Sequence, residues 1–202
     1  MDQSRYYLRV LVEEIHSAIV ATIDKEGHPV TRAIDIMLCD KQGVYFLTAK
    51  GKDFYRQLIE QRYIALSAVK DGKAISLRGY VDNIGKEKLD EIFRKNPYMQ
   101  KIYPGDTREA LEVFCLSRAS GEYFYISNPD HVFRDRIAIG AAEETAGGYY
   151  IGKSCTGCAS CMEVCPQKCI EIASKTAVID QHHCLHCGRC AEVCPAGAIE
   201  RR

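Results

Sequence analysis

Apolar and polar residues alternate along most of the N-terminal part of the chain, which is the pattern of strands that bury one face. Turn-forming residues interrupt the alternation at short intervals, as Gly27 and Pro29 do within KEGHPV. Short strands joined in this way predict a mainly β fold, a closed or nearly closed antiparallel barrel. The expected strands are 18–24, 31–38, 43–49, 63–69, 74–84, 111–127 and 131–139.

Three stretches repeat their apolar residues at helical spacing instead. In the second of them Phe54, Leu58 and Ile59 fall on one face, and the third ends before Pro97, which cannot continue a helix. Short helices are therefore expected beside the barrel. Their ranges are 3–17, 52–61 and 86–96.

Composition narrows the class of protein. The chain is 47% hydrophobic, enough for a packed core, and its 27 basic residues balance 27 acidic ones, so no polyanion-binding surface and no nucleic-acid partner are expected. Charges at Arg5, Arg9 and Glu13 interrupt the first apolar stretch, unlike a secretion signal, and no stretch has the length of a membrane span. We expect a soluble cytoplasmic protein with no membrane partner.

The composition changes near residue 150, which predicts two domains, 1–150 and 151–202. Nine of the 11 cysteines lie between Cys155 and Cys194. Because the cytosol disfavours structural disulfides, ligand thiolates are the better interpretation. The region also contains a repeat: CTGCASCMEVCPQKCIE aligns with CLHCGRCAEVCPAGAIE, and each half reads C-x2-C-x2-C-x3-C-P.

This spacing suits cubane iron–sulfur clusters. Three close thiolates surround one cluster, and the fourth, after a helical turn, points to the cluster of the other half. The spacing predicts two [4Fe–4S] clusters. The first would be bound by Cys155, Cys158, Cys161 and Cys194, and the second by Cys184, Cys187, Cys190 and Cys165.

A zinc site and a disulfide knot are the alternatives. Zinc sites gather four ligands as two pairs and have no use for the third close cysteine or the Cys-Pro ending. The motif resembles that of bacterial two-cluster ferredoxins over residues 151–202, which implies a small α+β domain. Cys169 stands where the second half has Ala198, and we expect a packed thiol there, with an extra ligand as the alternative. We expect His182, His183 and His186 to be solvated surface residues.

Three stretches of the barrel, VTRAIDIML, VYFLTAKGKDFYRQL and SLRGYV, occur in an order that resembles the flavin-binding split barrel of the pyridoxamine 5′-phosphate oxidase-like superfamily. The resemblance covers residues 10–152 and implies bound FMN. Fixed cations and hydroxyls near a helix start suit the phosphate dianion, and the backbone after the strand arginine would follow the isoalloxazine edge. The residues implied are Arg32, Ala33, Ile34, Asp35, Thr48, Lys50 and Lys52, with Ile36 continuing the backbone run.

The stretch VFRDRIAI resembles the R-L-H-D-R motif of pyridoxamine phosphate oxidases with departures. The flavin-side arginine is kept as Arg136. Val132 and Arg134 stand where the motif has the Arg and His that hold the substrate, which argues against the vitamin substrate. For Arg32, Lys50, Lys52 and Arg136, solvated surface residues remain the alternative.

Together these features predict an FMN-dependent oxidoreductase that passes electrons between the clusters and the flavin and acts on an unidentified small molecule. The alternative is an electron-transfer protein whose barrel serves as a scaffold for dimerisation and docking. Deazaflavin is an alternative ligand for the barrel. Haem is disfavoured because His16 and His28 do not lie in apolar stretches. The resemblance also implies a homodimer, and the clusters imply an external redox partner.

Overall fold

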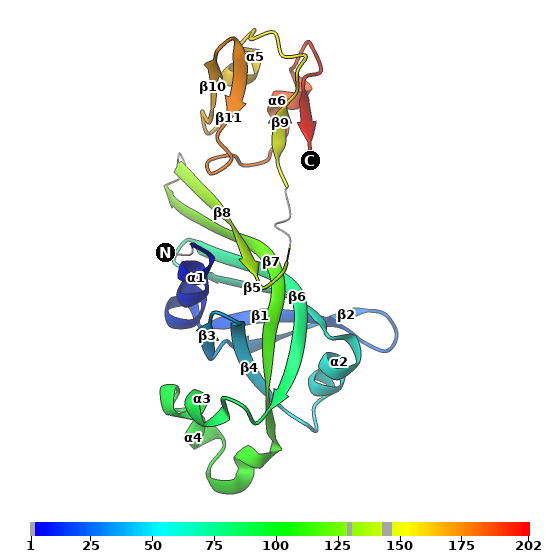
Figure 1. Cartoon of the computed structure of the whole chain (residues 1–202), viewed down its shortest axis with the longest axis vertical. Helices are drawn as coiled ribbons and strands as arrows, with labels where there is room; N and C mark the ends of the chain where they lie inside the picture. The colour runs from blue at the N-terminus through cyan, green and yellow to red at the C-terminus, as the bar shows by residue number, and fades with distance from the viewer. Residues whose placement is uncertain (1–2, 129–130, 143–146) are drawn as a thin grey trace. The chain divides into compact units, whose positions relative to one another are not determined.

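The computed structural model describes residues 3–128, 131–142 and 147–202, which divide into two compact units (Figure 1). The first unit contains the described residues up to Tyr123 and residues 136–142. The second contains residues 124–128, 131–135 and 147–202. Residues 149 and 150 pair with the C-terminal strand, so the second unit begins before residue 150 in this part of the chain, and it also includes the strand residues 124–128 and 131–135.

The first unit is built on an eight-stranded sheet with the order β2-β1-β5-β6-β7-β4-β3, in which β8 pairs with β7. The strand pairs β1–β2, β1–β5, β5–β6, β3–β4 and β4–β7 are all antiparallel, as the alternation predicted. The strands are β1 (Ser17–Ile23), β2 (Pro29–Asp35), β3 (Leu38–Asp40), β4 (Gly43–Ala49), β5 (Tyr63–Lys70), β6 (Lys73–Gly85), β7 (Leu111–Asn128) and β8 (His131–Ile139).

The two ends of this strand order, β2 and β3, are consecutive in the chain and are joined by two residues. These are Ile36 and Met37, which are 0% and 6% exposed. The N–H of Ile36 donates to His16 O at 2.8 Å, and that of Met37 donates to Tyr45 O at 2.8 Å. The chain therefore closes the sheet into a barrel, and the expected closure is confirmed.

Alternation along the central strands explains the core. Val20 of β1, Leu66 of β5 and Leu77 of β6 point inward and are at most 2% exposed, while their neighbours in sequence face outward. Strand β4 is buried on both faces, because Phe46 lies in the barrel and Tyr45 packs in a cluster with residues of α3. A strand covered on both sides loses the polar alternation.

Short helices cover the barrel where the sequence predicted them. Phe54 and Leu58 of α2 are buried, whereas Ile59, expected on the same face, is 44% exposed. Ile92 and Phe93 of α3 pack on Tyr45, and α3 ends at Lys95, shortly before Pro97. The helices are α1 (Gln3–Arg9), the π-helical η1 (Val10–Ile15), α2 (Asp53–Gln61), α3 (Leu89–Lys95), α4 (Met99–Ile102) and the 3-10 helix η2 (Gly105–Ala110).

Residues 147–202 of the second unit form two small sheets and two helical turns. Strand β9 (Tyr149–Ile151) pairs with β12 (Ile199–Arg201), and β10 (Ile170–Ala173) pairs with β11 (Thr176–Ile179). The turns α5 (Ser160–Glu163) and α6 (Arg189–Glu192) occupy equivalent places in the two halves of the repeat. Within the described ranges, no helix has both the length and the apolar character required to span a bilayer.

Strands β6 and β7 approach each other closely at two glycines. A Cβ on Gly121 would lie 1.8 Å from Ser76 O, and one on Gly79 would lie 2.2 Å from Arg118 O. Backbone atoms cannot yield as the end of a side chain can, so each position requires glycine.

We therefore expect Gly121→Ala to destabilise the barrel by about 2 kcal/mol, the usual cost of overpacking, measured as a loss in the free energy of unfolding by denaturant. Gly51→Ala is the matched control, because a Cβ there meets no atom within 4 Å. Equal stability of the two variants would show that β6 and β7 do not approach as described.

Candidate functional site

The two halves of the cysteine repeat adopt the same backbone conformation. Left-handed residues recur at three equivalent positions, and in each half the residue after the second of these begins the helical turn that carries the third cysteine. The fourth cysteine follows that turn and precedes proline, so the chain changes direction there. The equivalent left-handed residues are Gly157, Ala159 and Lys168 in the first half and His186, Gly188 and Gly197 in the second.

Each half contributes cysteines to both of two cavities. The first cavity, with about 330 Å³ of empty space including its open mouth, combines three cysteines of the first half with Cys194 of the second. The second, of the same size, combines three cysteines of the second half with Cys165 and Cys169 of the first. The spacing predicted that the fourth cysteine of each half serves the cluster of the other half, and the cysteines that line the two cavities are arranged in this way. The other lining cysteines are Cys155, Cys158 and Cys161 in the first cavity and Cys184, Cys187 and Cys190 in the second.

The thiols surround these volumes instead of meeting at a point. In the described part of the chain, no three His, Cys, Asp or Glu side chains form a group able to hold a single metal ion. A cubane has its iron atoms at separate corners, so it needs thiolates spread over a wall. The donor arrangement fits [4Fe–4S] clusters. In each cavity the middle cysteine, Cys158 or Cys187, is exposed, which leaves one corner of each site accessible from solvent.

Backbone N–H groups point at several ligand sulfurs. Ala177 N lies 3.4 Å from Cys155 Sγ, His186 N lies 3.4 Å from Cys184 Sγ, and Ala198 N lies 3.3 Å from Cys194 Sγ. Such bonds stabilise negative charge on sulfur and on a bound cluster. Burial opposes that charge and raises the pKa of the Cys161 and Cys190 thiols, so binding of iron must displace their protons.

Cys169 has surroundings that differ from those expected. Its thiol lines the second cavity, and its Sγ lies 3.6 Å from Cys165 Sγ. It also hydrogen-bonds to Cys184, which lowers the pKa of Cys184 against the opposing effect of burial. The equivalent Ala198 is 2% exposed and has no such group. The second cavity thus contains a fifth thiol where we expected apolar packing, and this makes the two sites unequal.

The expectation of solvated surface histidines holds for the exposure of His182, whereas His183 and His186 are half-buried. All three also contact the described residues 124–128 and 131–135, which we call the hairpin segment. His183 Nδ1 donates to Val132 O at 2.7 Å, and His182 Nδ1 donates to Arg134 O at 3.0 Å. Sequence reasoning missed these contacts because the residues are far apart in the chain.

In the barrel, Arg32 lies under α2 and not in solvent. Its Nη1 donates to Thr22 Oγ1 at 2.6 Å, its Nη2 donates to Gln57 Oε1 at 3.0 Å, and its guanidinium carbon lies 4.5 Å from the centre of the Phe54 ring. Thr22 and Gln57 are buried. Burial lowers the pKa of Arg32. Within the described ranges Arg32 forms no ion pair, so a half-buried cation lies at the first turns of α2 without a carboxylate. Thr22 and Gln57 were not recognised from the sequence.

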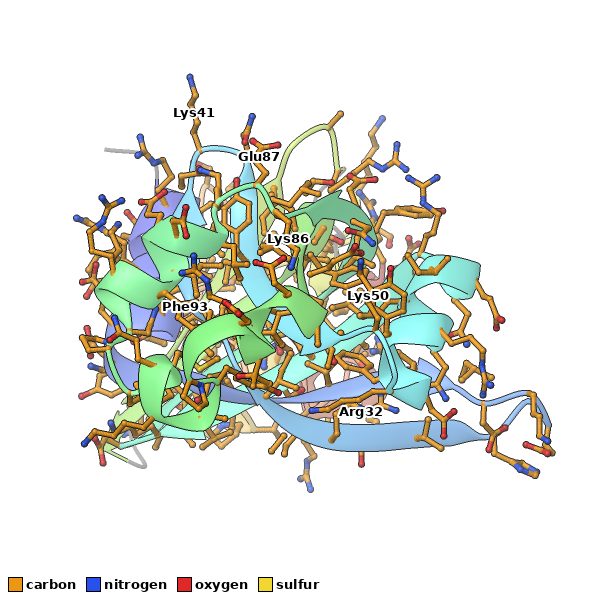
Figure 2. The ribbon with its side chains drawn as sticks, turned by 90° about the horizontal axis from the view of Figure 1, so that it is seen from below. Arg32, Lys41, Lys50, Lys86, Glu87 and Phe93 are labelled. Atoms are coloured by element: carbon orange, nitrogen blue, oxygen red, sulfur yellow. The ribbon has the colours of Figure 1, made fainter. Side chains whose placement is uncertain are left out.

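The other residues predicted for the phosphate, Thr48, Lys50 and Lys52, lie at the end of β4 and in the turn before α2. Figure 2 shows Arg32 and Lys50 beside α2. Thr48 is 4% exposed, and Lys52 is exposed immediately before α2. Lys50 differs, because its Nζ lies 2.8 Å from Glu112 Oε1. Hydrogen bonds from Asn83, Lys50 and Tyr55 lower the pKa of Glu112 to about 2, so this carboxylate neutralises Lys50 at physiological pH.

The backbone predicted to follow the flavin edge belongs to β2, at one end of the strand order. Among the described strands β2 is paired with β1, so alternate N–H and C=O groups of residues 33–35 face away from the ladder. Ala33 is exposed and Ile34 is half-buried. The Asp35 carboxylate is occupied: burial raises its pKa, but hydrogen bonds from Ser17 and Tyr98 outweigh this and lower it overall.

Arg136 lies on a strand that is not adjacent to β2, the strand of Arg32, in the sheet. It lies half-buried on β8, which pairs with β7, whereas Arg32 lies on β2 at the end of the strand order. Arg32 therefore lies against α2 and Lys52 directly precedes it, while Thr48 is buried on β4 and Glu112 neutralises Lys50. The donors of Arg32 and Lys52 fit a dianionic phosphate, since the half-buried guanidinium has no counter-ion among the described residues.

The fold and the two cysteine-lined cavities define a split-barrel protein with an iron–sulfur module. A family described as "Pyridoxamine 5′-phosphate oxidase" matches residues 7–122, more than half of the chain, and one described as "4Fe-4S dicluster domain" matches residues 154–198. The chain belongs to the pyridoxamine 5′-phosphate oxidase family and carries a ferredoxin-type domain for iron–sulfur clusters. These matches support a redox or electron-transfer protein.

Curated relatives match the barrel in part. A "Pyridoxine/pyridoxamine 5′-phosphate oxidase" of Bacteroides thetaiotaomicron is 33% identical over 94 residues, which cover 45% of this chain and 44% of the relative. A "Dihydrophenazinedicarboxylate synthase" of Pseudomonas chlororaphis is 28% identical over 126 residues, which cover 60% of this chain and 57% of the relative. The chain thus spans about half the length of the curated relatives that it matches.

Solved structures agree on the fold. A nimc/nima family protein of Clostridium acetobutylicum has a TM-score of 0.56 at 16% identity over 69% of this chain and 95% of its own. A protein of the same organism, related to general stress protein 26 and of the pyridoxinephosphate oxidase family, has a TM-score of 0.53 at 16% identity, covering 69% and 96%. At this identity they show the barrel fold alone.

Paired cysteine substitutions test the exchange of ligands between the halves. Cys155→Ala with Cys194→Ala removes two ligands of the first cavity, so about four iron atoms per chain should remain of about eight. Cys155→Ala with Cys165→Ala removes one ligand from each cavity, and most of the iron should be lost. Anaerobic iron and sulfide analysis gives the counts. If the second pair retained the iron of one cluster and the first pair lost both, each half would bind its own cluster.

Proposed function

We propose that this chain is an FMN-dependent oxidoreductase in which electrons pass between two [4Fe–4S] clusters of the tail and a flavin held by the barrel. The observation that carries the proposal is the presence in one chain of two cavities that share cysteines between the halves and a barrel of the pyridoxamine 5′-phosphate oxidase family. Flavin accepts one or two electrons and clusters transfer one at a time, so the combination links single-electron transfer to two-electron chemistry on a small molecule.

The residues around α2 would bind the phosphate. Thr22, Gln57 and Phe54 hold the Arg32 guanidinium in place, so its side chain loses little freedom when an anion binds. The free N–H groups at the start of α2 and the Lys52 ammonium add to the same positive region. Because Glu112 neutralises Lys50, we assign Lys50 a smaller part than Arg32 and Lys52.

The chemistry of the substrate site differs from that of pyridoxamine phosphate oxidases. At the positions of their substrate-binding Arg and His this chain has Val132 and Arg134. The Val132 backbone bonds to Gln167 and His183, and the Arg134 side chain bonds to His186, so both residues are engaged with the tail. The substrate we propose is therefore a different small molecule.

A second copy of the chain would complete the flavin site and contribute its own Arg136. An apolar outer face of β1, β5 and β6 supports this part of the proposal: Ile19, Tyr63 and Tyr80 are 50%, 42% and 47% exposed there. Tyr63 and Tyr80 are cross-strand partners with ring centres 5.1 Å apart. Exposed apolar groups that cluster on one face are typical of an interface.

Flavin and iron content test the cofactor proposal. Anaerobically purified protein, reconstituted with FMN, should contain about one flavin and about eight iron atoms per chain. Loss of a charge-assisted phosphate contact costs about 1.5–3 kcal/mol, so Arg32→Ala and Lys52→Ala should each weaken FMN binding roughly tenfold to hundredfold. Iron content should be unchanged.

Lys25→Ala, which removes an exposed lysine of the β1–β2 turn, is the matched control and should bind FMN normally. Clusters without flavin after reconstitution would instead support a carrier whose barrel is a scaffold. Selective binding of a deazaflavin would correct the cofactor. Full FMN affinity in both variants would contradict the phosphate assignment.

Ile19→Glu tests the dimer. A glutamate buried in the proposed interface would have no partner, so the dimer should dissociate at concentrations at least about a hundredfold higher than for the unchanged chain. Light scattering after size exclusion measures this. Ile102→Glu, at an exposed apolar residue of α4, is the control. A monomeric unchanged chain, or a dimer that tolerates Ile19→Glu, would show that this face is not the interface.

A further inference from the structure

The hairpin segment is bound to the loops of the second cluster site by several hydrogen bonds. Val132 N donates to Gln167 Oε1 at 3.1 Å and Arg134 N donates to His182 O at 2.8 Å. The Phe133 ring stacks on His182 with centres 5.6 Å apart and planes 6° from parallel. Backbone and ring contacts together fix the position of Arg134 relative to these loops.

The side chain of Arg134 continues into the ligand loop itself. Its Nη1 donates to His186 Nδ1 at 2.8 Å, and its guanidinium carbon lies 5.2 Å from the centre of the Phe124 ring. Because a guanidinium can only donate, His186 accepts at Nδ1. His186 lies between Cys184 and Cys187, and its N–H points at Cys184 Sγ at 3.4 Å. Arg134 thus places a fixed positive charge beside two ligands of the second cluster.

Among the residues that the structure describes, the first site has no counterpart to the bond between Arg134 and His186. The residue equivalent to His186 is Gly157, which has no side chain to accept a bond. Beside the second site, the negative charge of Asp180 opposes the positive charge of Arg134. The Asp180 carboxylate accepts a hydrogen bond from His182 N at 3.0 Å and lies 3.8 Å from His183 Nε2. Asp180 is half-exposed on the side chain, so solvent screens it more than the half-buried Arg134.

We propose that Arg134 is a positioning residue that raises the reduction potential of the second cluster, so that an electron entering the tail resides there in preference to the first cluster. Reduction adds one negative charge to a cluster, and a nearby fixed cation stabilises that added charge. The bond to His186 also holds the loop so that the His186 N–H stays directed at sulfur, which acts in the same direction. The inference rests on the two clusters proposed above and is independent of the flavin.

A redox titration of the intact chain, followed by electron paramagnetic resonance, tests this proposal. Arg134→Gln should make the reduction of one of the two clusters about tenfold less favourable, a shift of about 59 mV for one electron, and should leave the other unchanged. Arg134→Lys keeps the charge and should recover a large part of the shift. Arg201→Gln, which removes an exposed charge of the same unit that lines neither cavity, should shift neither cluster.

The shifted cluster is identified in the chain that carries Cys155→Ala and Cys194→Ala, which keeps the second site. Arg134→Gln should lower the remaining potential there. If Arg134→Gln prevents assembly of the second cluster, His186→Ala tests the positioning role, since it removes the acceptor that holds the guanidinium beside the ligand loop. It should lower the potential of the second cluster and leave that of the first unchanged. Equal shifts of both clusters, no shift, a shift confined to the first cluster, or the presence of a single cluster would overturn the inference. Absence of flavin would overturn the enzyme proposal alone.

Discussion

The fourth cysteine of each half lines the cavity of the other half, and the architecture of the tail depends on this exchange. Each turn, α5 or α6, carries one ligand toward its own cavity, and the following Cys165 or Cys194 faces the opposite one. Neither half has a complete ligand set alone. The apolar cluster that includes Ile170, Ala177 and Ile179 lies among the same cysteines, so core packing and ligand geometry are a single constraint.

The two sites share a backbone but differ in the groups around them. In the second site Cys169 adds a thiol, and the hairpin segment adds Arg134 through His186. In the first site the equivalent positions are Ala198 and Gly157. The two halves of the repeat thus differ at a few side chains around the two sites. If each site holds a cluster as proposed, these differences would make the two reduction potentials unequal.

The barrel combines a buried polar group with an apolar core at one place. Burying the polar groups of Arg32, Thr22 and Gln57 beneath α2 costs free energy of desolvation. The hydrogen bonds among these three side chains offset that cost. This cation has no carboxylate partner in the described part of the chain, and the proposed phosphate site rests on that feature. The Lys50–Glu112 pair shows the other outcome, in which the chain supplies its own counter-ion.

Local patterns allowed much of this to be predicted from the sequence. Strand β4 was predicted with its observed bounds, Gly43–Ala49, because a turn sequence ends at Gly43 and a mostly apolar stretch follows it up to Ala49. The eight ligand cysteines follow from spacing alone, since their geometry is set within a few residues. Partners distant in sequence had no such signal: the bond between Arg134 and His186, the pairing of Lys50 with Glu112 and the bond from Gln57 to Arg32 arise from tertiary packing. Ile36 and Met37, which close the barrel between β2 and β3, looked like the end of one longer strand.

The most direct test of the account is rapid anaerobic mixing of the flavin-loaded protein with a limiting amount of dithionite. Electrons should then redistribute from the iron–sulfur clusters to the flavin, or the reverse, in a first-order process seen in both absorbances, and its rate should be unchanged by tenfold dilution of the protein. A redistribution rate that falls in proportion to protein concentration, or clusters that become reduced while the flavin absorbance never changes, would contradict it.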